Sequence, residues 1–340
     1  MATIIEYLKL LLHRENLSYE QAKDLLDIVF KGEVPESQIA AFLTAMQIKG
    51  LTPEELAGFA QSLRSHAVKV ETGLDNMVDV VGTGGAAVKT FNVSTASALA
   101  AAGAGAYVAK HGNRAITSKS GAADVLEELG VNVNPGPQIV AECIRNANIG
   151  FMFAPMYHPA MKYVQPIRKS LGFRTLFNIL GPLANPAGAQ SLVLGVAEED
   201  LMNVMTEALR ILGTSFALVV HCSGLDEISI NGVTKICELK DGKITKKEFN
   251  PEDFGVKPCK IDHMKVPDAK ASAVIIKNIL NGKETGPCRD IVVLNSAAAL
   301  IACGLADNFN SAIEMAENSI KEGKAMNCLE KLIEISNHVS

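Results

Sequence analysis

Two neighbouring runs of this chain have residue types that bind phosphate groups. Gly82-Thr83-Gly84-Gly85-Ala86-Ala87 follows the apolar segment 78–81, and its glycines let backbone N–H groups turn towards one anion. Asn92-Val93-Ser94-Thr95 then opens a helical pattern, so a helix N-terminus and two hydroxyls would face the same anion. The two runs predict a phosphate-binding loop. The alternative is a turn that only connects a strand to a helix.

Two common nucleotide-binding motifs fit this loop poorly. The dinucleotide pattern G-x-G-x-x-G/A is met by Gly82, Gly84 and Ala87, but it needs an acid about 20 residues later to bind a ribose hydroxyl. The first acid that follows is Asp124, which stands too far along the chain. A P-loop needs Gly before its Lys, and Val88 occupies that position. Neither motif is therefore predicted.

A basic segment follows the next strand-like run. Lys110-His111-Gly112-Asn113-Arg114 comes directly after 106–109, and lysine and arginine both bind phosphates. Ligands of open α/β sheets bind at the carboxyl ends of strands, so this segment should lie beside the glycine loop. Ser118-Lys119-Ser120-Gly121 then precedes a predicted helix at 122–129 and adds more hydroxyls. Taken alone, the basic segment could be a solvated turn, but the three loops together predict one anion site.

Two arginines could bind a substrate carboxylate. Arg168 and Arg174 stand in a region that also contains His158-Pro159 and the run 178–186. A bidentate arginine–carboxylate contact fixes geometry and contributes about 1.5–3 kcal/mol. Alternatively, Arg168 could be an exposed charged residue on a helix. A single histidine such as His158 more often caps a helix or packs in the core than takes part in catalysis.

A carboxylate pair follows another strand-like run. Asp226-Glu227 comes after 216–221, and adjacent carboxylates repel each other unless a cation lies between them. Oxygen ligands shared with substrate phosphates suit Mg²⁺. Such pairs are common on surfaces, so this prediction depends on the pair lying at the same sheet edge as the loops.

The elements that must position these residues change character along the chain. Residues 1 to about 67 predict four helices, with start signals at Ser18/Gln21 and at Thr52-Pro53-Glu54-Glu55. From Asp79 onwards, strand-like and helix-like segments alternate, which is typical of a largely parallel sheet. Asn231-Gly232 and Asp241-Gly242 predict hairpin turns in an antiparallel excursion. Helices return from about residue 269. The fold class is α/β, with a small all-helical N-terminal domain and a larger α/β domain.

Composition excludes several classes of protein. Of 340 residues, 48% are hydrophobic and 20% charged, which excludes disorder. The net charge of −5 and the absence of Trp argue against nucleic-acid binding. The uncharged run 91–109 contains too many Asn, Ser, Thr and Gly residues for a membrane span, and the N-terminus reads as an amphipathic helix rather than a signal peptide. Seven widely spaced cysteines fit the reducing cytoplasm.

These segments together resemble the anthranilate phosphoribosyltransferases, within the nucleoside phosphorylase-like phosphoribosyltransferases. The resemblance extends over nearly the whole chain; beyond the segments above it rests on Ser120-Gly121-Ala122-Ala123-Asp124 and on Arg174-Thr175 with the run 178–186. It implies transfer of a phosphoribosyl group from 5-phosphoribosyl 1-diphosphate to anthranilate in tryptophan biosynthesis. It also implies Mg²⁺, a homodimer formed through the helical part, a helical domain at 1–70 that helices from about 160–185 join, and an α/β domain at 71–340.

The resemblance assigns residues by matching position. It implies that Arg168, Lys110 and His111 are catalytic and that Ser94, Asp226 and Glu227 bind Mg²⁺. Anthranilate would contact Gly82, Asn113, His158, Arg168 and Gly181. The phosphoribosyl diphosphate would contact Gly82, Gly84, Gly85, Ala86, Thr90, Asn92, Val93, Ser94, Thr95, Lys110, His111, Gly112, Asn113, Arg114, Ala115, Ile116, Thr117, Ser118 and Ala122.

This chain departs from the family pattern at two positions. Ala86 stands where the family usually has Asp, and Ala122 stands where it usually has Ser. We expect these changes to alter the dependence of the activity on Mg²⁺ and phosphoribosyl diphosphate without abolishing it. They are also the only support for one alternative, a non-catalytic paralogue that binds nucleic acid. A second alternative is a nucleoside phosphorylase, which the run 174–186 fits poorly.

Overall fold

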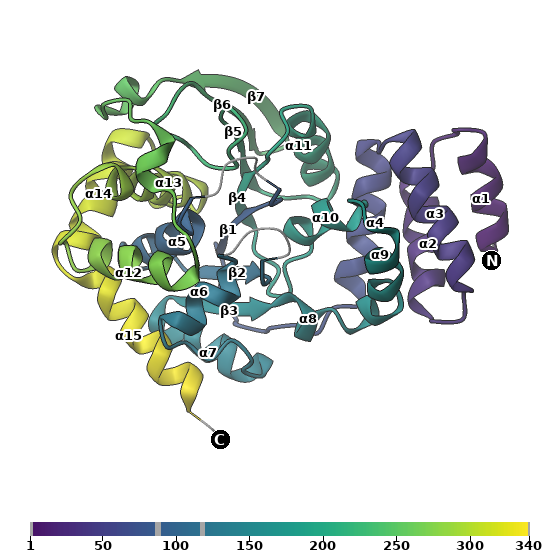
Figure 1. The fold of residues 1–340 in the computed structure, drawn as a ribbon, viewed down its shortest axis with the longest axis horizontal. Helices are drawn as coiled ribbons and strands as arrows, with labels where there is room; N and C mark the ends of the chain where they lie inside the picture. Colours follow the sequence, from purple (N-terminus) through teal and green to yellow (C-terminus); the bar gives the residue numbers. More distant parts are fainter. Residues whose placement is uncertain (1–2, 86–89, 116–119, 339–340) are drawn as a thin grey trace.

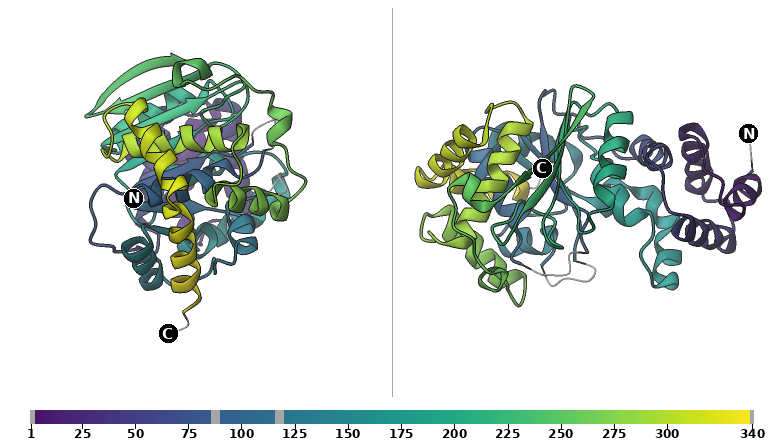
Figure 2. Two further views of the ribbon diagram at one scale, coloured as in Figure 1. Left: turned by 90° about the vertical axis from the view of Figure 1, so that its left-hand side faces the viewer. Right: turned by 90° about the horizontal axis from the view of Figure 1, so that it is seen from above.

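The computed structural model describes residues 3–85, 90–115 and 120–338 (Figure 1). Four helices at one end of the long axis precede a seven-stranded sheet with helices on both faces, and Figure 2 shows the helical part as an extension from the sheet. This arrangement confirms the predicted fold class. None of the described helices combines the length and apolar character needed to span a bilayer.

The N-terminal helices begin where the sequence predicts caps. Ser18 accepts a hydrogen bond from the Gln21 N–H before α2, and Thr52 accepts one from the Glu55 N–H before α4. Both caps are reciprocal, because the Gln21 and Glu55 side chains accept from the cap N–H groups. The four helices are α1 (Ile4–Leu12), α2 (Tyr19–Phe30), α3 (Glu36–Lys49) and α4 (Pro53–Ser65).

The sheet is parallel at its centre and antiparallel at one edge. Its order is β3-β2-β1-β4-β5-β6-β7, in which β1 to β5 are parallel and β6 and β7 form an antiparallel hairpin. Because β1 lies between β2 and β4, the loops that follow these three strands meet at one edge. The strands are β1 (Val78–Gly82), β2 (Val108–Gly112), β3 (Ile149–Phe153), β4 (Ser191–Gly195), β5 (Phe216–His221), β6 (Thr234–Lys240) and β7 (Lys243–Phe249).

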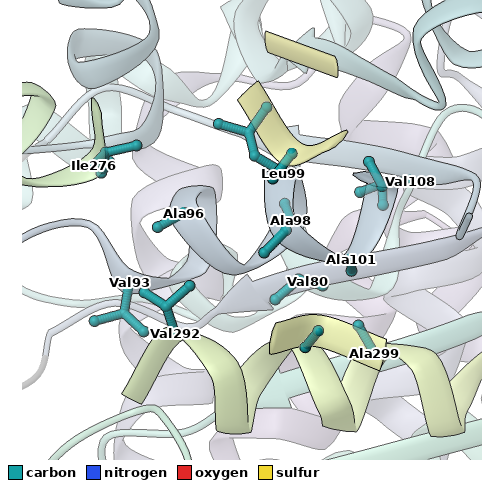
Figure 3. Packing of buried hydrophobic residues seen from close by; sticks show 14 of the residues in the cluster. Val80, Val93, Ala96, Ala98, Leu99, Ala101, Val108, Ile276, Val292 and Ala299 are labelled. Atoms are coloured by element: carbon teal, nitrogen blue, oxygen red, sulfur yellow. The ribbon is translucent and has the colours of Figure 1, made fainter. Parts of the chain in front are cut away.

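One face of the sheet packs against a helix made almost entirely of small residues. Helix α5 contacts α13, α14 and α15, and its alanines let these helices approach closely (Figure 3). Buried serine hydroxyls link the helices: Ser319 Oγ donates to the Ala100 carbonyl at 2.8 Å, and Ser296 Oγ donates to the Ser97 carbonyl at 3.1 Å. These contacts fix the middle and the C-terminal half of α5 against α13 and α14. The helices around this face are α5 (Val93–Gly103), α6 (Ala122–Glu128), α12 (Ala269–Leu280), α13 (Pro287–Ala302), α14 (Phe309–Lys321) and α15 (Lys324–Asn337).

The other face shares its core with the helical end. Leu192, Leu194 and Val219 from the sheet belong to the same buried cluster as Phe42 and Phe59 of the N-terminal helices. Helix α9 packs against α3, and α10 against α4. The domain boundary near residue 70 stays a prediction. The remaining elements are α7 (Pro137–Ala147), α8 (Ala154–Tyr157), η1 (Pro159–Tyr163), α9 (Gln165–Leu171), α10 (Phe177–Leu180), η2 (Gly181–Leu183), α11 (Leu201–Ile211), η3 (Pro251–Phe254) and η4 (Ile261–Met264).

Two local predictions are wrong. Strand β2 runs to Gly112 rather than ending at residue 109, so Lys110 and His111 lie inside the strand. Residues 228–230 are buried but form no strand, because the Asn295 side chain bonds both the N–H and the carbonyl of Ile228. Asn231-Gly232 is therefore not a turn between two strands. Asp241-Gly242 is one, with φ of 50° and 76°.

Candidate active site

A cavity of about 400 Å³ opens at the carboxyl ends of the central strands and reaches α9 and α10. It brings together almost all of the predicted residues that the structure describes. It is lined by Val81, Gly82, Thr83, Gly84, Gly85, Thr90, Phe91, Asn92, Val93, Ser94, Lys110, His111, Gly112, Asn113, Arg114, Ala115, Ser120, Gly121, Ala122, Ala154, Gln165, Arg168, Arg174, Phe177, Asn178, Gly181, Pro182, Asp226 and Glu227.

Lys110 places a buried ammonium group beneath the first loop. Its Nζ donates to the Val80 carbonyl at 2.7 Å and to Ser94 Oγ at 3.3 Å. Burial lowers the pKa of Lys110 to about 8, and the buried Asp79 carboxylate opposes that shift. Asp79 in turn accepts from the Asn185 amide at 2.8 Å and from the His111 N–H at 3.3 Å. This network joins β1, β2 and the run 178–186 under the cavity.

The carboxylate pair enters the site between two glycines. A Cβ at Gly82 would overlap the Asp226 carboxylate, and one at Gly195 would overlap the Asp226 backbone. The Gly84 N–H donates to Asp226 Oδ2 at 3.3 Å, whereas Glu227 Oε2 is buried with no hydrogen-bond partner among the described residues. Burial raises the pKa of Asp226, and burial together with the charge of Asp226 raises that of Glu227 well above its usual range. Two buried, adjacent carboxyl groups with a free oxygen fit a hard divalent cation.

No group of three or more His, Cys, Asp or Glu side chains able to hold a metal occurs in the described ranges. A site that relies on two carboxylates needs further oxygen ligands. Substrate phosphates and water normally complete the coordination of Mg²⁺ in such sites.

Arg168 faces the cavity from the opposite side. Its guanidinium lies 5.5 Å from the centre of the Phe177 ring and donates to Gln165 Oε1 at 3.2 Å and to Asn178 Oδ1 at 3.4 Å. Burial lowers the pKa of Arg168, but an arginine stays charged at neutral pH. Arg174 does not join it: its guanidinium lies against the glycine loop, 3.4 Å from the Gly84 carbonyl and 3.4 Å from Glu198.

Two buried histidines connect the sheet to the turn at Gly181. His111 Nδ1 lies 3.2 Å from the Gly181 carbonyl, so this nitrogen carries a proton. His111 Nε2 lies 3.2 Å from His158 Nε2, so in the neutral pair His158 donates and His111 accepts. Burial lowers the pKa of His111 to about 4 and that of His158 to about 3. Both rings are therefore neutral at physiological pH.

Some predicted residues do not line the cavity. Thr95 is fully buried in α5, where its N–H donates to the Asn92 side chain that caps the helix. His158 lies behind His111 and contacts the cavity only through it. Ala86, Ile116, Thr117 and Ser118 lie outside the described residues.

Sequence reasoning missed several lining residues on the Arg168 side. Gln165 stands one helical turn before Arg168, and this i, i+3 spacing could have identified it. Asn178 is the first residue of the run 178–186, and Phe177 directly precedes that run. No residue pattern pointed to Phe91, an apolar side chain that reaches the cavity from the segment between two loops.

Comparisons with known proteins show the family of the chain. Residues 5–67 match the helical bundle domain of a glycosyl transferase family, and residues 74–326 match its a/b domain. An anthranilate phosphoribosyltransferase from Rhizobium johnstonii is 44% identical over 326 residues, which cover 96% of each chain. One from Neisseria meningitidis is 45% identical over 337 residues, covering 98% of this chain and 95% of the relative.

Solved structures show the same fold. The anthranilate phosphoribosyltransferase of Thermus thermophilus superposes with a TM-score of 0.92 at 37% identity, covering 97% of this chain and 99% of that one. The Saccharomyces cerevisiae enzyme, in complex with PRPP and Mg, gives 0.90 at 29% identity and covers 99% and 98% of the two chains. The chain therefore belongs to this glycosyl transferase family and, within it, to the anthranilate phosphoribosyltransferases.

Proposed function

We propose that this chain transfers the phosphoribosyl group of 5-phosphoribosyl 1-diphosphate to the amino group of anthranilate, forming N-(5-phosphoribosyl)anthranilate and diphosphate in tryptophan biosynthesis. One observation carries the proposal. A single cavity combines a glycine loop, the buried Lys110 ammonium and a carboxylate pair on one side with a stacked arginine on the other. The relatives support this function and not the nucleoside phosphorylase or nucleic-acid-binding hypotheses.

The sheet side suits the phosphoribosyl diphosphate. Glycines of the loop after β1, the N-terminal end of α5 and Lys110 all line the cavity. These groups stabilise the negative charge that develops as the diphosphate departs. They are already in place, so this electrostatic stabilisation needs no rearrangement. The residues implied by the resemblance that line the cavity on this side are Gly82, Gly84, Gly85, Thr90, Asn92, Val93, Ser94, Lys110, His111, Gly112, Asn113, Arg114, Ala115 and Ala122.

Asp226, Glu227 and the Ser94 hydroxyl are the residues that would hold Mg²⁺. The partnerless oxygen of Glu227 and the raised pKa values of both carboxyl groups are those expected of a cation site. When bound, Mg²⁺ would neutralise charge on the diphosphate oxygens.

The Arg168 side suits anthranilate. Its guanidinium can pair with the anthranilate carboxylate, while Gln165 and Asn178 hold the guanidinium in place. His111 lies between the two sides, because its ring contacts the Gly181 carbonyl, and His158 lies behind it. Pairing of Arg168 with the anthranilate carboxylate orients the aromatic amine towards the anomeric carbon of the ribose. Positioning of this kind can supply much of a rate enhancement.

The chemistry needs no strong general base at the start. An aromatic amine is neutral at pH 7, so its lone pair is free to attack. The bond from the anomeric carbon to the diphosphate oxygen breaks, the carbon–nitrogen bond forms, and the amine nitrogen releases one proton. The residues described above bind and orient the two substrates and stabilise the leaving charge.

The test follows anthranilate fluorescence after addition of phosphoribosyl diphosphate, first with Mg²⁺ and then with EDTA. We expect the fluorescence to fall only when the metal is present. Asp226→Asn and Glu227→Gln should each lower the rate by about 100-fold or more, and more Mg²⁺ should recover part of the loss. No fall in fluorescence at any Mg²⁺ concentration would contradict the proposed function.

We further propose that the chain forms a homodimer through its helical end and works in the cytoplasm. Ile5 and Leu12 of α1 and Ile48 of α3 are large apolar side chains exposed on two helices that contact each other, which supports an interface there. The seven free thiols support a reducing compartment.

A further inference from the structure

One carboxylate oxygen joins Ala115 to Gly121, and both residues line the cavity. The Ala115 N–H donates to Asp124 Oδ2 at 3.0 Å, and the Gly121 N–H donates to the same oxygen at 3.2 Å. Asp124 lies in the first turn of α6 and does not line the cavity. We call this junction of Ala115, Gly121 and Asp124 the neck.

The neck leaves no room for a side chain at Gly121. A Cβ there would overlap the Ala115 nitrogen and would lie 2.7 Å from the Arg114 carbonyl carbon and 2.8 Å from Asp124 Oδ2. Real Cβ atoms do not approach other atoms so closely. The backbone on the two sides of the neck is therefore in direct contact.

The other oxygen of Asp124 holds an arginine of the site. Arg114 Nη1 donates to Asp124 Oδ1 at 3.1 Å, and Arg114 Nη2 donates to Glu127 Oε1 at 2.6 Å. The guanidinium also lies 5.4 Å from the centre of the Phe153 ring. Asp124 thus contacts the Arg114 side chain with one oxygen and the neck with the other.

The neck is also connected to the first loop. Asn92 Nδ2 donates to the Ser120 carbonyl at 3.2 Å, while the Asn92 Oδ1 accepts from the Thr95 N–H and caps α5. A change at the neck would therefore move cavity-lining residues of two loops. Capping α6 requires only the bond from Gly121; the bond from Ala115, on the far side of the loop, has no role in a helix cap.

We propose that Asp124 is a positioning residue for the phosphate side of the site. It acts through the neck, which holds Asn113, Arg114 and Ala115 in register with Ser120 and Gly121. The proposal rests on the proposed function, since these residues line the half of the cavity assigned to phosphoribosyl diphosphate. Losing the neck should weaken binding of that substrate much more than binding of anthranilate.

The test compares Asp124→Ala, Asp124→Asn and Gly121→Ala with Glu127→Gln in the full chain. Asp124→Ala removes the acceptor, whereas Asp124→Asn keeps one oxygen for the two N–H groups. Gly121→Ala separates the neck without changing any charge. Glu127→Gln is the matched control, because Glu127 contacts Arg114 but neither N–H of the neck.

Steady-state kinetics give the first readout. We expect Asp124→Ala and Gly121→Ala to raise the KM for phosphoribosyl diphosphate about tenfold or more, with kcat and the KM for anthranilate changed less than about threefold. Asp124→Asn should recover most of the loss. Glu127→Gln should stay within about threefold of wild type. If Asp124→Ala does not fold, Asp124→Asn and Gly121→Ala decide the question.

Two readouts do not need turnover. Hydrogen-exchange mass spectrometry on peptides that contain Ala115 or Gly121 should show faster exchange in Asp124→Ala and unchanged exchange in Glu127→Gln. Calorimetric titration with phosphoribosyl diphosphate and Mg²⁺ should reproduce the order of the KM values. An inactive wild type would contradict the proposed function and leave this comparison intact. Unchanged affinity in Asp124→Ala and Gly121→Ala, or an equal loss in Glu127→Gln, would overturn the role of the neck.

Discussion

Arg168 presents its guanidinium to the cavity from a stack on Phe177. We expect Arg168→Ala to raise the KM for anthranilate about 10- to 150-fold, because a paired carboxylate contact contributes about 1.5–3 kcal/mol. The KM for phosphoribosyl diphosphate should stay within about twofold. Steady-state kinetics with each substrate varied in turn measure both quantities.

Lys169→Ala is the control for that prediction. Lys169 follows Arg168 on the same helix, but its side chain is exposed and does not line the cavity. We expect its kinetics to match wild type. An anthranilate KM in Arg168→Ala equal to that of Lys169→Ala would show that the carboxylate binds elsewhere.

The buried histidine pair predicts a stability that depends on pH. His111 and His158 have folded-state pKa values of about 4 and about 3, below the ordinary 6.5. As the pH falls below about 6.5, the unfolded chain binds protons that the folded chain does not, so the free energy of unfolding decreases. Each neutral imidazole contributes a slope of up to about 1.4 kcal/mol per pH unit. Burial raises the pKa of Asp79 to about 6, so below that pH the folded chain binds a proton at Asp79 that the unfolded chain does not. This proton raises the free energy of unfolding and opposes the effect of the histidines.

Comparing variants isolates the contribution of one imidazole. Between pH 7 and pH 5, His158→Gln should lose about 2 kcal/mol less stability than wild type, and urea unfolding at the two pH values measures the difference. His13→Gln, which changes an exposed histidine, should behave as wild type. Equal losses in wild type and His158→Gln would show that His158 is protonated in the folded chain.

At this scale the sequence predicted residue types well and orientations poorly. The sequence predicts Lys110 in an anion-binding loop after the strand, whereas it is buried inside β2 with its Nζ bonded to the Val80 carbonyl and to Ser94 Oγ. Its side chain is long enough to reach these acceptors, and that reach is not visible in a hydrophobicity pattern. His158 needed the position of His111, which comes from a distant strand, before its partner could be known.

Helix α4 depends on a single carboxylate. Glu55 is fully buried and accepts from the Leu17 N–H at 2.8 Å, from the Thr52 N–H at 2.9 Å and from Lys49 Nζ at 2.7 Å. Glu55→Ala should destabilise the helical end by about 3–5 kcal/mol, because it leaves the buried Lys49 ammonium without its charged partner. We expect thermal unfolding monitored by circular dichroism to show the Tm lowered by about 5 °C or more.

Glu54→Ala is the matched control, since Glu54 lies in the same helical turn but is exposed. Its Tm should stay within about 2 °C of wild type. If both variants had the wild-type Tm, the buried ion pair would contribute nothing to the stability of this helix.

Element types followed from local chemistry, while some boundaries did not. The caps at Ser18 and Thr52 and the turn at Asp241-Gly242 are formed by near neighbours in the sequence. The segment 228–230 has the composition of a strand, but both backbone groups of Ile228 bond to the side chain of Asn295 in α13, and the Ser229 N–H donates to Thr234 Oγ1. A long-range side-chain contact of this kind leaves no periodic signal.

Large apolar side chains are exposed at the helical end of the molecule. Leu12 is 76% exposed and Ile48 is 65% exposed. If a second copy covers them, the chain should elute with the mass of two chains, and the double variant Leu12→Glu, Ile48→Glu should elute with the mass of one. Light scattering coupled to size-exclusion chromatography measures both. The rate per chain should change less than about twofold, since residues of one chain line the cavity.

Val274→Glu is the control for the dimer. Val274 is 53% exposed on α12, far from the helical end (Figure 1). We expect it to leave the mass unchanged. A double variant at α1 and α3 that keeps the mass of wild type would place the interface elsewhere or show that there is none.

The packing of α5 has a consequence for synthesis of the protein. The bond from Ser319 to the Ala100 carbonyl joins residues 219 positions apart, and the alanines of α5 are covered by α13, α14 and α15. A ribosome completes the glycine loop, Lys110 and the carboxylate pair long before it has produced these helices. During synthesis, α5, which carries Ser94, therefore lacks the helices that cover its apolar side. That side stays accessible to chaperones until residues beyond 320 have emerged.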